Sequence, residues 1–398
     1  MTDERRYVAE KGETFLELSL AQATELTELG FCRVTPSSSP GRWRVTDVNK
    51  VGVAVLDGVT IHVMPKTPLE NIVYMASLGG MQLAPGALVG HGVDRSLPSA
   101  LAQAFVQTVD AATRRGLVKG YRTIQESASV VRGRWDIARQ LRVRPGIPLP
   151  IEIDYDEFSE DTDENRILHS AIRLLGGLTD LPGAVRVSLA RLRMMFAEVG
   201  TVPRGAALPN VTLTRLTQHY DPPLRLARVI LDALSWTHVE GPSRGGSFLV
   251  NMANVFERYV AARVSEHLRD AGVALTAQDR AWWLDVDRVI SLRPDLVIRR
   301  ADHVVTVADT KYKNLSVNAG SPANSDVYQA VAYALALGVS TAHLIYVAGE
   351  VDSRHLEVAV AGVTVCVHSV PLAGNPEALE STMTALAEVL IESERARV

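Results

Sequence analysis

Short apolar runs separated by turn residues dominate the first hundred positions, and this pattern predicts a β-rich N-terminal part. Residues 51–56 and 59–63 are strand-like runs joined by Asp57-Gly58, a dipeptide typical of a tight hairpin turn. A further strand is expected at residues 43–45, after a loop rich in Ser, Pro and Gly. The pattern therefore indicates a compact β-rich domain over residues 1–98.

One helix is expected within that domain, over residues 14–29. Thr14 and Glu17 have the spacing of a capping box, and Gly30 follows where a C-cap is expected. A half-barrel or adaptor domain would have this content. We find no group of side chains in residues 1–98 that has the character of a catalytic site.

The central residues, 99–245, combine helical and strand-like patterns. Helices are expected from Pro98 to about Arg115 and from Asn165 to Leu175, where apolar residues recur at helical spacing. Residues 241–246 have the composition of a linker. This middle region is interpreted as mixed α+β.

The last part, residues 246–398, predicts alternating helices and strands. The expected order is a helix over 252–270, strands over 282–290, 294–299 and 304–311, a helix over 325–337, a strand over 342–347, a strand pair over 356–370 and a closing helix over 376–396. The first six elements follow the order αβββαβ, which is typical of a mixed α/β layer fold.

Composition and charge favour an ordinary globular chain. The 398 residues suffice for two or three domains, and the formal net charge of −4 argues against a uniformly basic nucleic-acid coat but not against a local basic track. Cys32 and Cys366 are the only cysteines, so a disulfide framework or cysteine-based zinc site is not available. No apolar run approaches the ~20 residues that span a bilayer, and the charged N-terminus lacks a signal core. A cytoplasmic protein without a membrane segment is therefore expected.

A basic stretch precedes an acidic stretch in the middle region. Residues 114–144 hold nine basic side chains against two acidic ones, with Tyr121 and Trp135 among them. Residues 152–164 then hold eight acidic side chains and no basic one. The basic stretch could bind a phosphate backbone, or pair with this protein's own acids or with a partner. A solvated surface is the alternative.

Candidate chemistry is concentrated in the segment RPDLVIRRADHVVTVADTKYKN, which predicts two strands. Asp309 and Lys311 are two residues apart, so their side chains leave the same face of the second strand. With a three-residue loop at 301–303, Asp295 would lie opposite Asp309, whereas a two-residue loop would place the two on opposite faces. Two facing carboxylates beside a lysine would bind a hard divalent cation and activate water.

Two helices supply further candidates. Glu257 lies within the arc of an apolar stripe formed by residues 256, 260, 264 and 268. A carboxylate facing a core needs a counter-charge, so a metal or an ion pair with an arginine is expected. Gln329 and Tyr333, four apart, share one face of the later helix.

A helix glutamate, Pro-Asp on a strand, Asp-x-Lys on the next strand and a helix with Gln-x-x-x-Tyr resemble the PD-(D/E)xK nuclease superfamily. Over most of its length the chain is similar to the McrC family, the nuclease subunit of modification-dependent McrBC restriction systems. The stretches that carry this resemblance are residues 51–53 with 61–66, residues 156–158 with 165–168, and Phe256-Glu257 with residues 309–313.

The resemblance implies a Mg²⁺-dependent DNA endonuclease with a PD-(D/E)xK core over residues 246–398. Asp295 and Asp309 would hold the metal, with Glu257 in its shell. Lys311 would lie beside the attacking water and offset charge in the transition state.

Auxiliary roles are also implied by the resemblance. Gln329 and Tyr333 would orient the water or contact the DNA backbone, and Tyr312 and Lys313 would contact phosphates. The family acts with a separate McrB-like AAA+ GTPase ring on DNA that carries 5-methylcytosine, and the chain could also self-associate. The N-terminal domain would dock and stimulate that ring.

Absent motifs are consistent with this division of labour. The chain has no G-x-x-x-x-G-K-[ST] sequence, so no nucleotide site is expected in it. Gly241-x-Ser243-x-Gly245 matches a nucleophile elbow, but no apolar strand precedes it and we interpret it as linker. Two alternatives stay open: a catalytically silent regulator of an AAA+ motor, and a stand-alone repair or resolvase-type nuclease.

Overall fold

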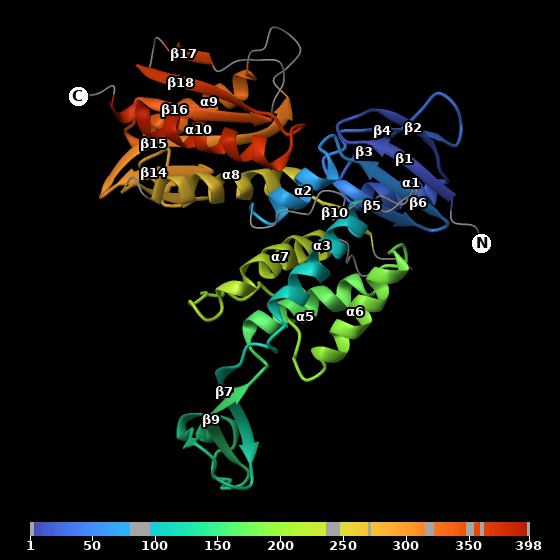
Figure 1. Cartoon of the computed structure of the whole chain (residues 1–398), viewed down its shortest axis with the longest axis vertical. Helices are drawn as coiled ribbons and strands as arrows, with labels where there is room; N and C mark the ends of the chain where they lie inside the picture. The colour runs from blue at the N-terminus through green and yellow to red at the C-terminus, as the bar shows by residue number, and fades with distance from the viewer. Residues whose placement is uncertain are drawn as a thin grey trace. The chain divides into compact units, whose positions relative to one another are not determined.

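The computed structural model of the chain describes residues 4–79, 96–235, 247–269, 272–314, 322–347, 354–358 and 362–395. It is a mixed α/β protein whose residues group into two compact units (Figure 1). Unit 1 combines residues 1–100 with residues 247–398, and unit 2 holds residues 101–246. The predicted boundaries near residues 98 and 245 stay predictions of domain organisation.

The N-terminal strands of unit 1 form two small sheets. One has the order β1–β6–β5–β10 and the other β2–β4–β3. Their bounds are β1 (Glu4–Ala9), β2 (Thr14–Glu17), β3 (Arg33–Pro36), β4 (Arg42–Thr46), β5 (Val51–Leu56), β6 (Val59–Met64) and β10 (Phe248–Val250). The predicted hairpin of residues 51–63 is present, and Gly58 in its turn has a φ of +74°.

The predicted helix over residues 14–29 is wrong in its first part. Residues 14–17 form β2, paired with β4, and α1 (Leu20–Glu28) begins after Ser19. Ser19 and Gln22 make the capping box, with hydrogen bonds of 3.2 and 2.8 Å. Leu16 is buried while its neighbours on both sides are exposed, which is the two-residue period of a strand. Pairing with β4 outweighs the weak local helix signal. A second helix, α2 (Leu69–Ala76), follows β6.

The strand β10 follows unit 2 in sequence and completes the first N-terminal sheet. It pairs antiparallel with β5, placing Phe248 opposite Val53 and Leu249 opposite Gly52. Gly52 has a φ of +133°, and a Cβ there would lie 2.0 Å from the carbonyl oxygen of Phe248. Only glycine permits this approach, so the sequence at position 52 decides whether β10 can join the sheet.

The C-terminal part of unit 1 is built on a six-stranded sheet of order β11–β14–β15–β16–β18–β17. β15, β16 and β18 run parallel to one another, and the other three strands are antiparallel to their neighbours. The bounds are β11 (Ala274–Ala277), β14 (Leu296–Arg300), β15 (His303–Asn314), β16 (Thr341–Val347), β17 (Arg354–Val358) and β18 (Val363–Val370). The predicted strands near 294–299, 304–311, 342–347 and 356–370 are thus confirmed.

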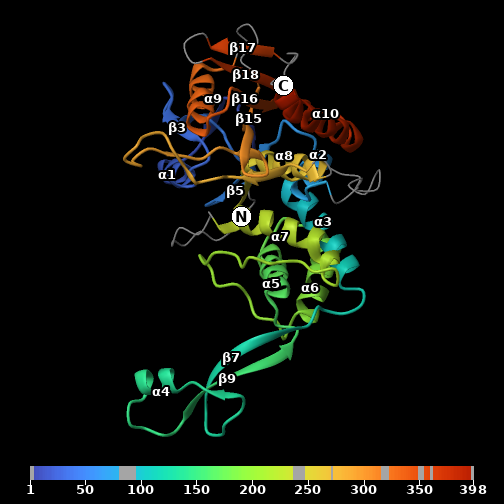
Figure 2. The ribbon, with the colours of Figure 1, turned by 90° about the vertical axis from the view of Figure 1, so that its left-hand side faces the viewer.

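Helices cover both faces of this sheet. Figure 2 shows α9 (Asn324–Leu337) on one side of β15, β16 and β18, with α8 (Met252–Leu268) and α10 (Pro376–Arg395) on the other. Apolar side chains of α9 pack on Val297, Val307 and Leu344, all buried. The stripe predicted on α8 is confirmed, because Phe256, Val260, Val264 and Leu268 are fully buried there.

The strand predicted at residues 282–290 is wrong in extent. Only β12 (Trp282–Trp283) and β13 (Ser291–Leu292) pair, as a separate two-stranded ladder. Between them the carboxylate of Asp285 accepts hydrogen bonds from the backbone amides of Val289 (3.0 Å) and Ile290 (2.6 Å). These bonds give the segment a turn in place of a continuous strand.

Unit 2 contains four longer helices and a β arm. The helices are α3 (Leu97–Ala112), which begins at the end of the first segment of unit 1, α5 (Asp163–Leu175), α6 (Gly183–Met195) and α7 (Asp221–Ser235), with the short η1 (Gln218–Tyr220) before α7. The arm is the sheet β7–β9–β8, formed by β7 (Gly120–Ala128), β8 (Arg134–Trp135) and β9 (Ile151–Ser159), with α4 (Ile137–Val143) beside it. The predicted helix at 165–175 is confirmed, and Thr162 caps it.

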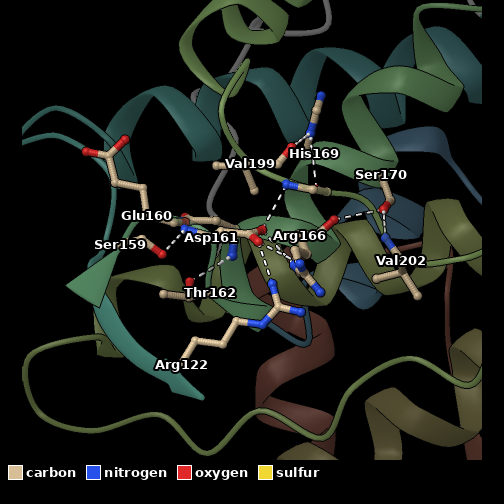
Figure 3. Close-up of polar contacts among 12 residues, drawn as sticks. Arg122, Ser159, Glu160, Asp161, Thr162, Arg166, His169, Ser170, Val199 and Val202 are labelled. Carbon is tan, nitrogen blue, oxygen red and sulfur yellow. Dashed lines mark hydrogen bonds and ion pairs between the residues drawn. The ribbon is translucent and has the colours of Figure 1, made fainter. Parts of the chain in front are cut away.

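A network of ion pairs holds the base of the arm to the helices of unit 2 (Figure 3). The carboxylate of Asp161, which follows β9, accepts from Arg166 on α5 in two bonds of 2.6 Å. It also accepts from Arg122 on β7 at 2.5 Å and from the Gly200 amide at 2.8 Å. These donors lower the pKa of Asp161, the Arg166 hydrogen bonds most. The network fixes where the two long strands leave the helical part.

Within the described residues, no helix is long and apolar enough to cross a membrane.

Candidate active site

The hairpin of β14 and β15 sets the register of the two aspartates. Its loop is the two-residue Ala301-Asp302, with Ala301 at a φ of +51°, and Arg300 pairs with His303. Of the two loop lengths weighed from sequence, the structure has the two-residue one, and that loop alone would separate Asp295 from Asp309.

A β-bulge corrects the register within the same hairpin. Arg299 pairs with Val304 but Ile298 pairs with Thr306, so Val305 has no partner across the ladder. From there Leu296 pairs with Ala308, and one further step brings Asp295 opposite Asp309. The bulge thus returns Asp295 to the face of the sheet that carries Asp309.

Asp295 is tied to β15 next to Asp309. Its Oδ2 accepts from the Thr310 amide at 2.7 Å and from the Thr310 hydroxyl at 2.8 Å. Its backbone carbonyl accepts from the amide of Gln278 at 2.9 Å. Two bonds thereby orient the side chain, and the third fixes the backbone of the residue.

Asp309 lies at the end of a buried run of β15 and is 3% exposed. Burial raises its pKa to about 6, with the charge of Asp295 adding to the shift, while Lys311 opposes it. The Lys311 ammonium forms an ion pair with Asp309 Oδ2. This ion pair gives the buried Asp309 carboxylate a counter-charge.

Glu257 on α8 is linked to Asp295 through a residue that sequence analysis missed. The Gln278 side-chain amide donates to Glu257 Oε1 and, at 2.9 Å, to Asp295 Oδ1. Burial raises the pKa of Glu257 to about 7, and the charge of Asp295 adds to this. Of the two counter-charges expected for Glu257, no ion pair with an arginine is found among the described residues, although Arg293 and Arg258 lower its pKa through their charge.

Gln278 has no motif that marks it. It follows β11, whose pairing with β14 places Ala277 opposite Leu296, so Gln278 comes level with Asp295 only through that register. Its backbone conformation, with a φ of +51°, is unusual for glutamine, but this conformation cannot be predicted from the sequence.

The predicted pair on α9 lies beside Lys311. Lys311 Nζ donates to Gln329 Oε1 at 2.8 Å, and Gln329 Nε2 donates to the Tyr333 hydroxyl at 2.7 Å. Tyr333 in turn donates to the Arg293 carbonyl at 3.2 Å. The helix therefore orients the lysine through a chain of neutral hydrogen bonds.

Tyr312 and Lys313 lie outside this cluster. The Tyr312 hydroxyl is 3.1 Å from the Thr67 hydroxyl and donates to Glu10 Oε2 at 3.3 Å, and Lys313 pairs with Asp326 at 2.7 Å. The structure thus brings together Asp295, Asp309, Lys311, Glu257, Gln329 and Tyr333, adds Gln278, and holds the other two residues elsewhere. Their role as phosphate contacts stays a prediction.

The carboxylates fit a magnesium ion by donor chemistry. Across the described ranges, no three His, Cys, Asp or Glu side chains are grouped closely enough to enclose a metal. Mg²⁺, however, commonly takes one or two carboxylates and completes its shell with water and substrate phosphate. Asp295 and Asp309 supply that pair, and a bound cation would offset the mutual repulsion that contributes to the raised pKa of Asp309.

Part of the basic stretch pairs with this protein's own acids. Arg139 and Arg144 both pair with Glu152, at 2.5 and 3.3 Å, and Lys119 lies 3.5 Å from Glu160. Arg132 stacks over the Tyr155 ring at 4.2 Å. Of the alternatives left open by sequence, pairing within the protein is therefore found for these side chains. The nucleophile-elbow string at residues 241–245 lies outside the described residues.

Together, the fold and this cluster define a mixed α/β protein with two carboxylates and a lysine on two paired strands, Asp295 just before β14 and the other two within β15. The family model described as "McrBC 5-methylcytosine restriction system component" matches residues 45–347. The chain belongs to this family.

A chain of a solved structure has a similar fold over nearly the whole length. It comes from a half-complex of a tetradecameric assembly of Thermococcus gammatolerans McrB AAA+ hexamers with bound McrC. The TM-score is 0.54 at 16% identity, covering 97% of this chain and 100% of that chain. A chain of the T. gammatolerans McrBC complex matches at 18% identity and a TM-score of 0.40, covering 66% of this chain and 88% of that chain. No match to a curated protein is significant.

Proposed function

We propose that this chain is the DNA-cleaving subunit of its restriction system and hydrolyses phosphodiester bonds with Mg²⁺. The observation that carries the proposal is the opposition of Asp295, just before β14, and Asp309, within β15, with the Lys311 ammonium against Asp309. A purely structural cluster of this kind would cost stability, because burial and mutual repulsion raise the pKa of Asp309 to about 6.

In this proposal Asp295 and Asp309 hold the metal, with Glu257 beside them. The bound ion would polarise the phosphate and lower the pKa of a bound water. Gln278 orients Glu257 and Asp295 relative to each other. The Lys311 ammonium, held by Gln329, offsets the negative charge that grows on the phosphoryl oxygens.

We propose a separate AAA+ GTPase as the partner and DNA with 5-methylcytosine as the substrate. The similar structure contains McrB AAA+ hexamers with bound McrC, and this chain has no P-loop sequence of its own.

The surface of the arm of unit 2 suits binding to a protein partner. Its exposed apolar side chains are those of Tyr121, Val130, Val131, Trp135, Ile137, Leu141, Val143, Ile147, Leu149 and Phe158. Such a group favours contact with protein, and the pairing of several neighbouring arginines with acids leaves less charge for DNA phosphates. Docking through the N-terminal part stays a prediction.

The test is cleavage of methylated DNA by the purified chain, with an McrB-like GTPase from the same organism, in Mg²⁺ and in EDTA. We expect Asp309→Asn and Lys311→Ala to lose on the order of a thousandfold or more in rate while DNA affinity is kept. Arg269→Ala, an exposed cation at the end of α8, is the charge-matched control and should cleave normally.

Each alternative has its own outcome in that experiment. Undiminished cleavage by Lys311→Ala would refute the catalytic assignment and favour a silent regulator of the motor. Full Mg²⁺-dependent activity without any GTPase would instead identify a stand-alone nuclease.

A further inference from the structure

The strand β15 leaves the regular ladder directly after the candidate catalytic lysine. Residues Val307 to Lys311 pair one to one with Ala342 to Tyr346 of β16, but the next pair is Asn314 with Val347. Tyr312 and Lys313 are therefore two extra residues on β15. Bulges beside active sites redirect side chains, and here the ladder no longer fixes the strand beyond Lys311.

The side chains of the two bulged residues replace the missing ladder contacts. Lys313 pairs with buried Asp326 on α9, on the side of the sheet that carries Gln329. Tyr312 extends to the N-terminal part of unit 1, where its hydroxyl meets Thr67 and Glu10. Its ring lies 6.1 Å from that of Phe256 on α8.

Glu10 and Thr67 come from one end of the N-terminal sheet. β1 and β6 are parallel, with Ala9 opposite Met64, so the residues that follow both strands emerge at the same edge. Glu10 Oε2 also accepts from the Lys66 amide at 3.1 Å. The Tyr312 hydroxyl can donate to Glu10 and accept from Thr67 at the same time.

The burial of Glu10 is costly for a side chain that only fills space. It is 2% exposed, burial raises its pKa, and its Oε1 has no hydrogen-bond donor in the described part of the chain. An apolar residue would fill the same volume at lower cost. What the carboxylate adds is a directed acceptor for the Tyr312 hydroxyl.

We propose that Glu10 and Thr67 hold Tyr312 and thereby position Lys311, so that the N-terminal part of unit 1 controls the geometry of the catalytic strand. Tyr312 is then a positioning residue, acting through the adjacent lysine, and not a phosphate contact. This inference rests on the proposed nuclease function, and it makes the N-terminal sheet a determinant of catalytic rate.

The test uses isosteric variants of the full chain with its GTPase. Tyr312→Phe and Thr67→Val each remove one hydroxyl, and Tyr328→Phe, on the exposed face of α9, is the matched control. We expect kcat to fall about 10- to 100-fold in the first two variants, as small misplacements of a catalytic group do. KM for DNA should be unchanged, and the double variant should be no slower than either single one.

A cycle with Lys311→Ala separates positioning from general weakening. If Tyr312 acts through the lysine, Tyr312→Phe should leave the residual rate of Lys311→Ala unchanged. A further loss of the same size in that background, or a wild-type kcat in Tyr312→Phe, would overturn the proposal.

Hydrogen exchange in EDTA provides a readout that does not depend on cleavage. Amides of residues 304–314 should exchange faster in Tyr312→Phe than in the wild type or in Tyr328→Phe. If exchange is unaltered, the positioning role fails even where DNA is cut. If the wild type cuts no DNA at all, the nuclease proposal fails, while the exchange result still decides whether Tyr312 holds β15.

Discussion

Two buried histidines lie on the face of the C-terminal sheet opposite the α9 cluster. His343 Nδ1 is 2.9 Å from His368 Nε2, so one ring donates to the other. Burial lowers the pKa of His343 to about 3 and that of His368 to about 4. Both rings are therefore neutral in the folded protein at physiological pH.

These shifts predict acid destabilisation. An unfolded histidine titrates near 6.5, so between that pH and about 4 the unfolded chain binds protons that the folded chain excludes. The free energy of unfolding should therefore be unaffected by these histidines above pH 6.5 and should fall as the pH drops. His343 alone should account for a loss on the order of 3 kcal/mol at pH 4. His343→Gln keeps a polar partner for His368 and should flatten the dependence, measured by urea unfolding from pH 4 to 8. His219→Gln, at an exposed position, should leave the slope as it is; an equal effect of both variants would contradict the assignment.

Individual site residues differ in how far sequence could predict them. Asp309 and Lys311 follow from two-residue spacing on one strand, and Gln329 and Tyr333 from four-residue spacing on one helix. Gln278 depends on the register between β11 and β14, a long-range property that no local pattern contains. Tyr312 was found but its surroundings were not, because Glu10 and Thr67 are far away in sequence.

At the scale of elements, a turn and a bulge jointly determine the site. The two-residue turn at Ala301-Asp302 moves Asp295 out of register, and the unpaired Val305 moves it back. Alternating polarity identified the two strands, but a bulge of one residue leaves no mark in a pattern with period two. The same limitation explains β2, where tertiary pairing with β4 prevailed over a helix signal.

Deleting Val305 should keep the two aspartates opposite each other. The deletion removes the residue without a partner, so the pairs Arg299–Val304 and Ile298–Thr306 become consecutive and the next steps still bring Asp295 opposite Asp309. Mg²⁺-dependent cleavage should therefore fall by much less than the roughly hundredfold that misplacement of a catalytic group causes. Circular dichroism would establish that the variant folds. A loss of about a hundredfold or more in a folded deletion variant would contradict the register argument.

At the scale of the whole molecule, unit 1 binds its first and last segments together by polar contacts. The buried Asn71 amide on α2 donates to the carbonyls of Leu372 (2.8 Å) and Gly374 (2.5 Å). Glu380 on α10 accepts from Tyr74 on α2 and from Arg263 on α8, each at 3.0 Å. The composition of the sequence predicted that these segments belong to different domains, because neither segment alone reveals the contacts between them.

Removal of the Asn71 amide should destabilise both ends of unit 1 together. Asn71→Ala leaves two buried carbonyls without their donor, which we expect to cost about 2–3 kcal/mol. Hydrogen exchange across a urea series would follow β6 and β18 separately, and their midpoints should shift by the same amount. The exposed Asn49→Ala is the control. A shift confined to one of the two strands would show that the segments unfold independently.

The pairing of β10 with β5 has a consequence for the chain while it is being synthesised. About 180 residues lie between β6 and β10, and a ribosome adding roughly 5–20 residues per second needs some ten to forty seconds to make them. Throughout that interval the outer edge of β5 has no strand beside it, and Gly52 leaves its backbone uncovered. The nascent N-terminal sheet is thus open to pairing with other chains until Phe248 emerges from the ribosome. A chaperone that covers this open edge of β5 would have to act while unit 2 is being translated.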